Sequence, residues 1–258
     1  MDLHLRGKRV LITGASKGIG ASAAEAFAEE GCNLHLAARN VEQMQALADR
    51  LRASHQIDVT VHGVDLRQGD DLAALAKAAG DIDILVNNAG DIPGGALDKI
   101  DEPTWRHAWD LKVFGFINLT RLVYAQMKAH GHGVVVNTIG AAGEKFDANY
   151  ICGSAGNAAL MAFTRALGGK SLKDNIRVVG INPGPVATER LITLLKTRAK
   201  HELGDESRYQ ELQKGLPLGR AAKPREIADL MTFLASERAG YTTGVIYTVD
   251  GGISSGFG

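Results

Sequence analysis

The residues around Tyr150 combine a phenol with a helical segment that can place other polar groups beside it. They read Asn-Tyr-Ile-Cys-Gly-Ser-Ala-Gly-Asn over 149–157, after a short apolar run and an Ala/Gly loop. A phenol ordinarily ionises near ~10, so acid–base work at neutral pH needs a nearby cation that stabilises the phenolate. Four residues after Tyr150 stands Ser154, which carries no charge. Tyr150 is therefore a candidate general acid/base that lacks the expected cation four residues later. Alternatively, Tyr150 is an aromatic residue that only packs in the core.

A glycine-rich turn near the N-terminus joins an apolar run to an Ala-rich segment of helical period. It reads Thr-Gly-Ala-Ser-Lys-Gly-Ile-Gly over 13–20. Glycines at such a turn let backbone N–H groups approach a pyrophosphate at the positive end of a helix dipole. The turn predicts a dinucleotide site, with contacts from Gly14, Ser16, Lys17, Gly18, Ile19 and Gly20.

The end of the second predicted strand indicates which dinucleotide binds. It reads Ala-Ala-Arg-Asn over 37–40. A site for NAD usually places an acidic side chain there, whereas the 2′-phosphate of NADP requires a cation. Arg39, with Asn40 beside it and Lys17 in the glycine turn, therefore favours NADP over NAD.

Short β-branched runs alternate with longer Ala/Leu-rich segments of helical period, and no composition shift marks a domain boundary. Strands separated by helices predict a parallel sheet. We expect one α/β domain over residues 1–258, with a doubly wound Rossmann-type sheet between two helical layers. Residues 188–219 mix apolar and charged side chains and suit either a surface helix pair or a lid over a pocket. Strands are expected at 9–12, 33–37, 59–62, 84–86, 134–137, 177–181 and 245–249.

The bulk composition argues against several classes of protein. Lys+Arg and Asp+Glu both number 29 and the pI is near 7.1, so no global field would attract nucleic acid or a membrane surface. Two cysteines are too few for a disulfide scaffold, and no Cys/His cluster has metal-ligand spacing. Since 18 uninterrupted apolar residues occur nowhere and no signal peptide is recognised, we expect a cytoplasmic protein without a membrane span or a metal.

Several motifs, in this order, resemble those of the short-chain dehydrogenase/reductase family over nearly the whole chain. They are the glycine turn at 13–20, Asp65, Asn-Asn-Ala-Gly at 87–90, Tyr150, Pro-Gly-xxx-Thr from 183 to 188, and Asp-Gly-Gly at 250–252. The resemblance implies a sheet of about seven strands, a nicotinamide nucleotide across the carboxyl ends of the strands, and a homotetramer or homodimer. The contacts it implies are Asp65 and Leu66 near the adenine, Asn88, Ala89 and Gly90 along the ribose, Tyr150, and Pro183, Gly184, Val186 and Thr188 at the nicotinamide.

The catalytic pattern implied by the resemblance is altered at three positions. Ser154 replaces a lysine that assists the tyrosine, Gly140 replaces a serine that hydrogen-bonds the substrate, and Lys112 replaces an asparagine on a helix facing the site. The flexible stem of Lys112 suggests that the missing cation has changed helices, with Ser154 orienting its ammonium. The other interpretation of Lys112 is an ordinary solvated charge.

The function expected from these residues is NADP(H)-dependent interconversion of a small-molecule carbonyl and an alcohol. Tyr150 would be the general acid/base, with Lys112 and Ser154 as helpers. An alternative is a nucleotide-binding protein with lost or weak catalysis that acts as a sensor or partner subunit, because the cofactor motifs are intact while the catalytic ones differ. A third is a dehydratase or isomerase on the same scaffold.

Overall fold

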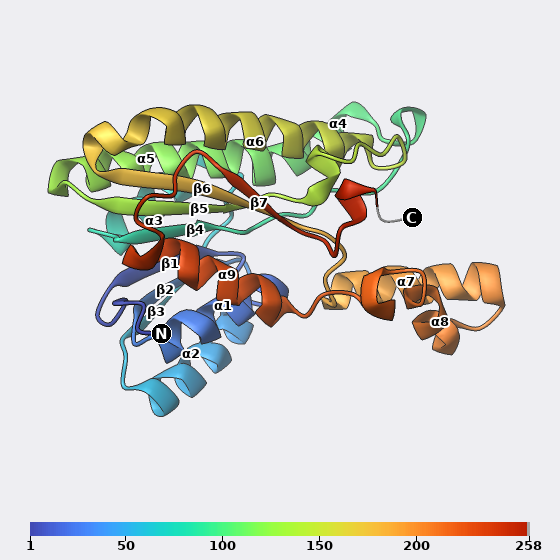
Figure 1. Ribbon diagram of the computed structural model, residues 1–258, viewed down its shortest axis with the longest axis horizontal. Helices are drawn as coiled ribbons and strands as arrows, with labels where there is room; N and C mark the ends of the chain where they lie inside the picture. The colour runs from blue at the N-terminus through green and yellow to red at the C-terminus, as the bar shows by residue number, and fades with distance from the viewer. Residues whose placement is uncertain (257–258) are drawn as a thin grey trace.

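One sheet of seven parallel strands runs through the molecule in the order β3-β2-β1-β4-β5-β6-β7 (Figure 1). The computed structural model describes residues 1–256, apart from the side chains of Arg198 and His201. The predicted single α/β domain is confirmed there, and residues 257–258 of its predicted range lie outside the described residues. The strands are β1 (Arg9–Thr13), β2 (Asn33–Ala38), β3 (Val59–Gly63), β4 (Ile84–Asn87), β5 (Gly133–Thr138), β6 (Ile176–Pro183) and β7 (Ile246–Val249).

The central strands form from short Val/Ile/Leu runs that are buried on both faces. Every residue of β4 is buried, and so is every residue of β6 before Pro183. Such continuous apolar runs are typical of parallel strands covered by helices on both sides. The strand order reverses between β1 and β4, which is where ligands bind in open α/β sheets.

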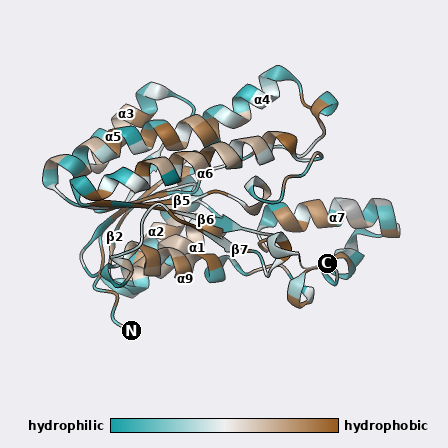
Figure 2. Ribbon diagram, turned by 45° about the horizontal axis from the view of Figure 1, so that its top comes forward, coloured by the Kyte–Doolittle hydropathy of each residue, from teal (hydrophilic) through white to brown (hydrophobic). Residues whose placement is uncertain are grey.

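Helices cover both faces of this sheet (Figure 1). On one face lie α1, α2 and α9, and on the other lie α3, α4, α5 and α6, while hydrophobic residues concentrate in the strands and the inward helix surfaces (Figure 2). Within the described part of the chain, no helix combines the length and apolar character needed to cross a bilayer. These helices are α1 (Gly18–Glu29), α2 (Val41–His55), α3 (Gly69–Ala79), α4 (Glu102–Trp109), α5 (Gly115–His130), α6 (Ile151–Ser171) and α9 (Pro224–Ala235).

A π-helical turn over Asp110–Phe114 joins α4 to α5 and carries Lys112. Insertions of this kind occur often at functional sites, because the wider turn changes the direction of the side chains on it. Gly115 follows directly, and a β-carbon there would come within 3.3 Å of the Leu66 carbonyl oxygen. The start of α5 is thereby held close to the loop that follows β3.

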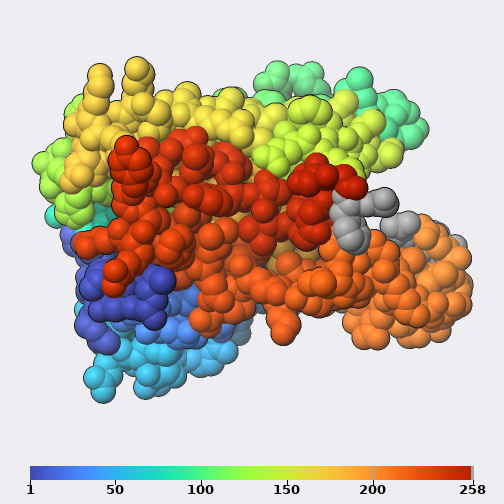
Figure 3. Space-filling view, in the orientation of Figure 1, coloured from blue at the N-terminus to red at the C-terminus, as the bar shows by residue number. Residues whose placement is uncertain are grey.

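Two helices project from the body beyond the sheet, α7 (Glu189–Leu203) and α8 (Tyr209–Gln213). They form a separate lobe in Figures 1 and 3. Thr188 caps α7, since its hydroxyl accepts from the backbone N–H of Leu191 at 3.4 Å. Residues 188–219, which the sequence analysis assigns to a surface helix pair or a lid, thus contain two helices that project from the rest of the protein after Thr188.

Candidate active site

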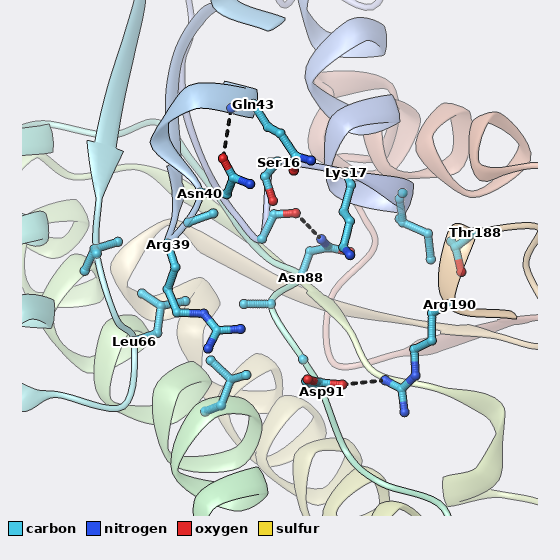
Figure 4. A pocket seen from close by; sticks show the side chains of 18 of the residues that line it. Ser16, Lys17, Arg39, Asn40, Gln43, Leu66, Asn88, Asp91, Thr188 and Arg190 are labelled. Atoms are coloured by element: carbon cyan, nitrogen blue, oxygen red, sulfur yellow. Dashed lines mark hydrogen bonds and ion pairs between the residues drawn. The ribbon is translucent and has the colours of Figure 1, made fainter. Parts of the chain in front are cut away.

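A cavity of about 980 Å³ opens where the strand order reverses, at the carboxyl ends of β1, β2 and β4. Figure 4 shows side chains from these loops and from the start of α7 around it. Five residues of the predicted cofactor set are not among its lining: Gly20, Tyr150, Pro183, Gly184 and Val186. Those that do line it are Gly14, Ser16, Lys17, Gly18, Ile19, Arg39, Asn40, Asp65, Leu66, Asn88, Ala89, Gly90 and Thr188.

The glycine turn packs against the Asn-Asn-Ala-Gly turn so closely that side chains are excluded. A β-carbon on Gly14, whose φ is +64°, would lie 2.9 Å from the Ala89 Cα. One on Gly20 would lie 2.2 Å from the Gly14 carbonyl oxygen. The Thr13 hydroxyl joins the two turns by accepting from the backbone N–H groups of Asn88 and Ala89, at 2.9 and 3.2 Å. This close-packed turn at the start of α1 fits the pyrophosphate of a dinucleotide.

Two cations, Arg39 and Lys17, reach into the cavity from different elements (Figure 4). The Lys17 ammonium lies 3.7 Å from a carboxylate oxygen of Glu189 at the start of α7, and both side chains are largely exposed. The Asp65 carboxylate accepts from Arg67 Nε at 2.8 Å, and this bond lowers the pKa of Asp65, with a smaller contribution from the charge of Arg39. The carboxylate of Asp65 is thus paired with Arg67, and Arg39 lines the cavity beside this pair.

Tyr150 lies just outside α6, as its N-cap residue, with φ −137° and ψ 37°. Its ring folds back over the first turn, where a β-carbon on Gly153 would lie 2.0 Å from the ring atom Cε1. Tyr150 packs against the apolar cluster formed by Ile92, Ala108 and Cys152, and its backbone forms a bridge with Gly95. Burial raises the pKa of Tyr150, and the charge and side-chain hydrogen bond of Arg190 oppose that rise.

Lys112 runs inward from the π-turn, beneath the Asn-Asn-Ala-Gly turn. A β-carbon on Gly90 would lie 2.9 Å from the Lys112 Cδ, so glycine at 90 makes room for the stem. The ammonium donates to the carbonyl oxygen of Ile139 at the end of β5. Burial lowers the pKa of Lys112 to about 8, and the charge of Arg190 adds to this effect. The side chain is therefore turned into the protein, toward Ile139, and is not a solvated surface charge.

Ser154 is engaged with the loop that precedes Tyr150. Its hydroxyl accepts from the backbone N–H of Asp147 at 3.1 Å and lies 3.4 Å from the carbonyl oxygen of the same residue. The hydrogen bonds of Ser154 and Lys112 thus run to different partners, and the structure does not pair the two side chains as the sequence analysis expected. Ser154 instead fastens the loop over 147–150 to α6.

Asn157, to which the sequence analysis assigns no role, lies beside Gly140. Gly140 has φ +145°, and a β-carbon there would lie 2.8 Å from Asn157 Nδ2. Asn157 is buried, and its side-chain oxygen has no hydrogen-bond partner among the described residues. No side chain fits at position 140 in this arrangement. The spacing from Gly153 to Asn157, four residues along the inward face of α6, is the signal that could have identified it.

Arg190, also missed from the sequence, closes the far side of the cavity. Its guanidinium lies 3.4 Å from a carboxylate oxygen of Asp91 (Figure 4). It also donates to the carbonyl oxygen of Ile92. Arg190 belongs to the first turn of α7, so the projecting lobe contributes directly to the site. Nothing local in the sequence distinguishes Arg190 from other cations of that lobe.

Comparison with known proteins identifies the family. The sequence model of the family described as Enoyl-(Acyl carrier protein) reductase matches residues 14–254. The chain is similar to 3-oxoacyl-(acyl-carrier-protein) reductase FabG of Chlamydia trachomatis, at 32% identity over 96% of this chain and 97% of the relative. It is equally similar to 7alpha-hydroxysteroid dehydrogenase of Escherichia coli K12, at 32% over 97% and 96%. The protein belongs to the short-chain dehydrogenase/reductase family.

The fold is shared with solved structures along its full length. The crystal structure of L-sorbose reductase from Gluconobacter frateurii, complexed with NADPH and L-sorbose, aligns with a TM-score of 0.93 and 34% identity, covering 100% of both chains. The complex of 7 alpha-hydroxysteroid dehydrogenase with NADH aligns with a TM-score of 0.85 and 29% identity, covering 97% of this chain and 96% of that one. Nicotinamide nucleotides with and without the 2′-phosphate, NADPH and NADH, thus occur in complexes of its structural relatives.

Proposed function

We propose that this protein is an NADP(H)-dependent oxidoreductase that interconverts a small-molecule carbonyl and an alcohol. The observation that carries the proposal is the continuity of the site: the cavity lined by the dinucleotide motifs ends at Arg190, which donates to the carbonyl oxygen of Ile92, and Tyr150 packs against the apolar cluster that contains Ile92. The acid–base candidate therefore borders the place where a dinucleotide would lie. Family membership and relatives that bind nicotinamide nucleotides support the same reaction class.

Each group of residues that would hold the cofactor would contact a different part of it. Gly14 to Gly20 would receive the pyrophosphate, and Arg39 with Lys17 and Asn40 would receive the 2′-phosphate. Asp65 and Leu66 would border the adenine, and Asn88 to Gly90 the ribose. The loop from Pro183 to Thr188 would approach the nicotinamide, which supplies a hydride when bound.

Tyr150 would act as the general acid in reduction and the general base in oxidation. In reduction its phenolic proton passes to the substrate oxygen as hydride reaches the carbonyl carbon, which leaves a phenolate that solvent reprotonates. In oxidation the phenolate accepts the alcohol proton. The ammonium of Lys112, delivered from the π-turn, would help to stabilise the phenolate, and Ser154 would hold the loop that carries Tyr150.

The segment over 188–219 would act as the lid of this site. Its first residues line the cavity and pair across it, Glu189 with Lys17 and Arg190 with Asp91. Closure of such a lobe excludes water and holds the reactants in register. We further propose a cytoplasmic homotetramer or homodimer; the exposure of Phe114, directly before α5, supports burial of this helix face in a partner subunit.

Turnover with a panel of carbonyls tests the proposal. NADPH oxidation would be followed with L-sorbose, a 3-oxoacyl thioester, a 7-oxo steroid, α-dicarbonyls and quinones. We expect turnover with at least one class and stronger binding of NADPH than of NADH. Tight binding of NADPH without turnover across the panel would instead support the alternative, a nucleotide-binding sensor or partner subunit. The observation favouring that alternative is the exclusion of any side chain at Gly140.

A further inference from the structure

The side-chain amide of Asn157 is buried in α6, and one end of it has no partner. Asn157 is 2% exposed, and its side-chain oxygen accepts no hydrogen bond from any described residue. The nitrogen end faces Gly140, where a β-carbon would lie 2.8 Å from Nδ2 and 3.5 Å from Oδ1. A buried acceptor without a donor costs stability, so an amide kept in this state needs a functional explanation.

A second asparagine reaches Gly140 from β6. Asn182 is fully buried, and its side-chain oxygen accepts from the Gly140 backbone N–H at 3.3 Å. Its side-chain nitrogen has no partner within residues 1–256. The surroundings of Gly140 therefore include an unsatisfied acceptor and an unsatisfied donor that are not bonded to each other.

Gly140 lies at the edge of the sheet where the dinucleotide cavity opens. It follows Ile139, whose carbonyl oxygen accepts from the ammonium of Lys112. The stem of Lys112 packs against Gly90, where a β-carbon would lie 2.9 Å from Cδ, and Gly90 lines the cavity. A continuous series of contacts thus connects the cavity to Gly140 and to Asn157 beside it.

Asn157 also lies near the phenol of Tyr150. It follows Gly153 by one turn on the same face of α6, and β-carbons at this spacing are about 5–6 Å apart. The Tyr150 ring atom Cζ, which carries the phenolic oxygen, lies 2.2 Å from the β-carbon position of Gly153. The Asn157 Cβ is therefore within roughly 8 Å of Cζ. One oxygen atom bonded to both the phenol and the amide spans this separation.

We propose that the Asn157 amide binds an α-hydroxycarbonyl substrate with both of its ends, beside the Tyr150 phenol. Nδ2 donates to the reacting oxygen, and Oδ1 accepts from the hydroxyl on the neighbouring carbon. This inference rests on the proposed function and names its substrate class. As hydride reaches the carbonyl carbon, negative charge develops on the oxygen, and a fixed N–H donor stabilises that charge.

The test compares ketones of the same shape that differ in one hydroxyl. Hydroxyacetone and butanone form a small pair, and 2-hydroxyacetophenone and propiophenone form a larger one. Values of kcat/KM with NADPH are measured in the wild type, in Asn157→Leu, which matches the shape of asparagine without its polar ends, and in Asn157→Ala. Thr164→Val is the matched control, because Thr164 is a buried polar residue of the same helix whose hydroxyl is already bonded to Asn137 and Leu160, at 2.9 and 2.7 Å.

We expect the wild type and Thr164→Val to prefer the hydroxylated ketone by about 10-fold or more, because the analogue leaves the amide oxygen unpaired. The preference should largely disappear in both Asn157 variants. No preference in the wild type, or the same preference in the Asn157 variants, overturns the inference and leaves the proposed function intact. If the wild type turns over no carbonyl at all, the proposed function fails and the inference fails with it.

Urea unfolding gives a readout that needs no turnover. An amide without a partner is replaced by an apolar group of the same shape at no cost, so Asn157→Leu should have the same or a higher unfolding midpoint than the wild type. Thr164→Val, which breaks satisfied hydrogen bonds, should have a lower one. Loss of all turnover in Asn157→Leu with the midpoint and NADPH binding retained supports the inference. A lower midpoint for Asn157→Leu overturns it, because the amide is then bonded in the free protein.

Discussion

The ring of Tyr150 lies directly over the backbone of Gly153, in the volume that a side chain at position 153 would need. A β-carbon there would lie 2.0 to 2.6 Å from three ring atoms. The glycine is therefore required by the orientation of the phenol and not by the helix, in which glycine costs about 1 kcal/mol relative to alanine.

Gly153→Ala should displace the Tyr150 ring and reduce turnover by about 100-fold or more, the usual contribution of a general acid/base. The affinity for NADPH should change little, because neither residue lines the cofactor cavity. Steady-state kinetics and a fluorescence titration with NADPH provide the two readouts. Gly169→Ala on the same helix is the control, since a β-carbon at 169 meets nothing within 4 Å; equal turnover in the two variants would contradict the assigned orientation of the ring.

Gly140→Ser, which introduces the serine that the family pattern has, should destabilise the protein and should not raise turnover. The backbone at 140 has φ +145°, and the new side chain would collide with Asn157. We expect a loss of about 1–3 kcal/mol in the free energy of unfolding, measured with urea. Combining Gly140→Ser with Asn157→Ala should recover part of the loss; strictly additive losses would show that the two positions do not compete for space.

The depressed pKa of Lys112 predicts a pH dependence of stability. The folded protein releases the Lys112 proton near pH 8, whereas the unfolded chain keeps it to about 10.5. Between these values the unfolded chain binds more protons, so the free energy of unfolding of the wild type should rise with pH relative to Lys112→Met, by at most about 1.4 kcal/mol per unit. Urea titrations of both proteins from pH ~8 to ~10 check this. Parallel pH profiles would mean that Lys112 titrates normally and is solvated.

Arg39→Ser should weaken NADPH binding selectively. Loss of a charge-assisted contact to the 2′-phosphate is worth roughly 1.5–3 kcal/mol, or about 10- to 100-fold in Kd, whereas NADH lacks that phosphate. The ratio of the two dissociation constants, measured calorimetrically, is the readout. Arg50→Ser provides the control, because Arg50 is an exposed cation of α2 that pairs with Glu25. If Arg39→Ser weakened both nucleotides equally, the assignment of Arg39 to the 2′-phosphate would be wrong.

The features predicted well from the sequence are those with a local signal. The strands appear where β-branched runs bounded by turns predicted them, each within about two residues. The glycine and Asn-Asn-Ala-Gly turns meet at one edge because carboxyl ends of parallel strands share an edge.

The features that were missed depend on where a helix begins and on contacts between distant segments. Ser154 lies one turn after Tyr150, as expected, and its backbone N–H donates to the Tyr150 carbonyl oxygen at 2.9 Å. The Tyr150 ring, however, folds over Gly153, and the Ser154 hydroxyl accepts from the backbone N–H of Asp147. The inward position facing Gly140 is therefore Asn157. Arg190 comes from a separate lobe, and no local pattern predicts which of its cations turns toward the body.

The central claim is that Tyr150 transfers the proton in an NADPH-dependent carbonyl reaction. The most direct measurement compares single-turnover hydride transfer in the wild type and Tyr150→Phe, both saturated with NADPH and given the same carbonyl substrate. We predict equal Kd values for NADPH and a rate that is lower by about 100-fold or more in Tyr150→Phe. Equal rates of hydride transfer in the two proteins would contradict the claim.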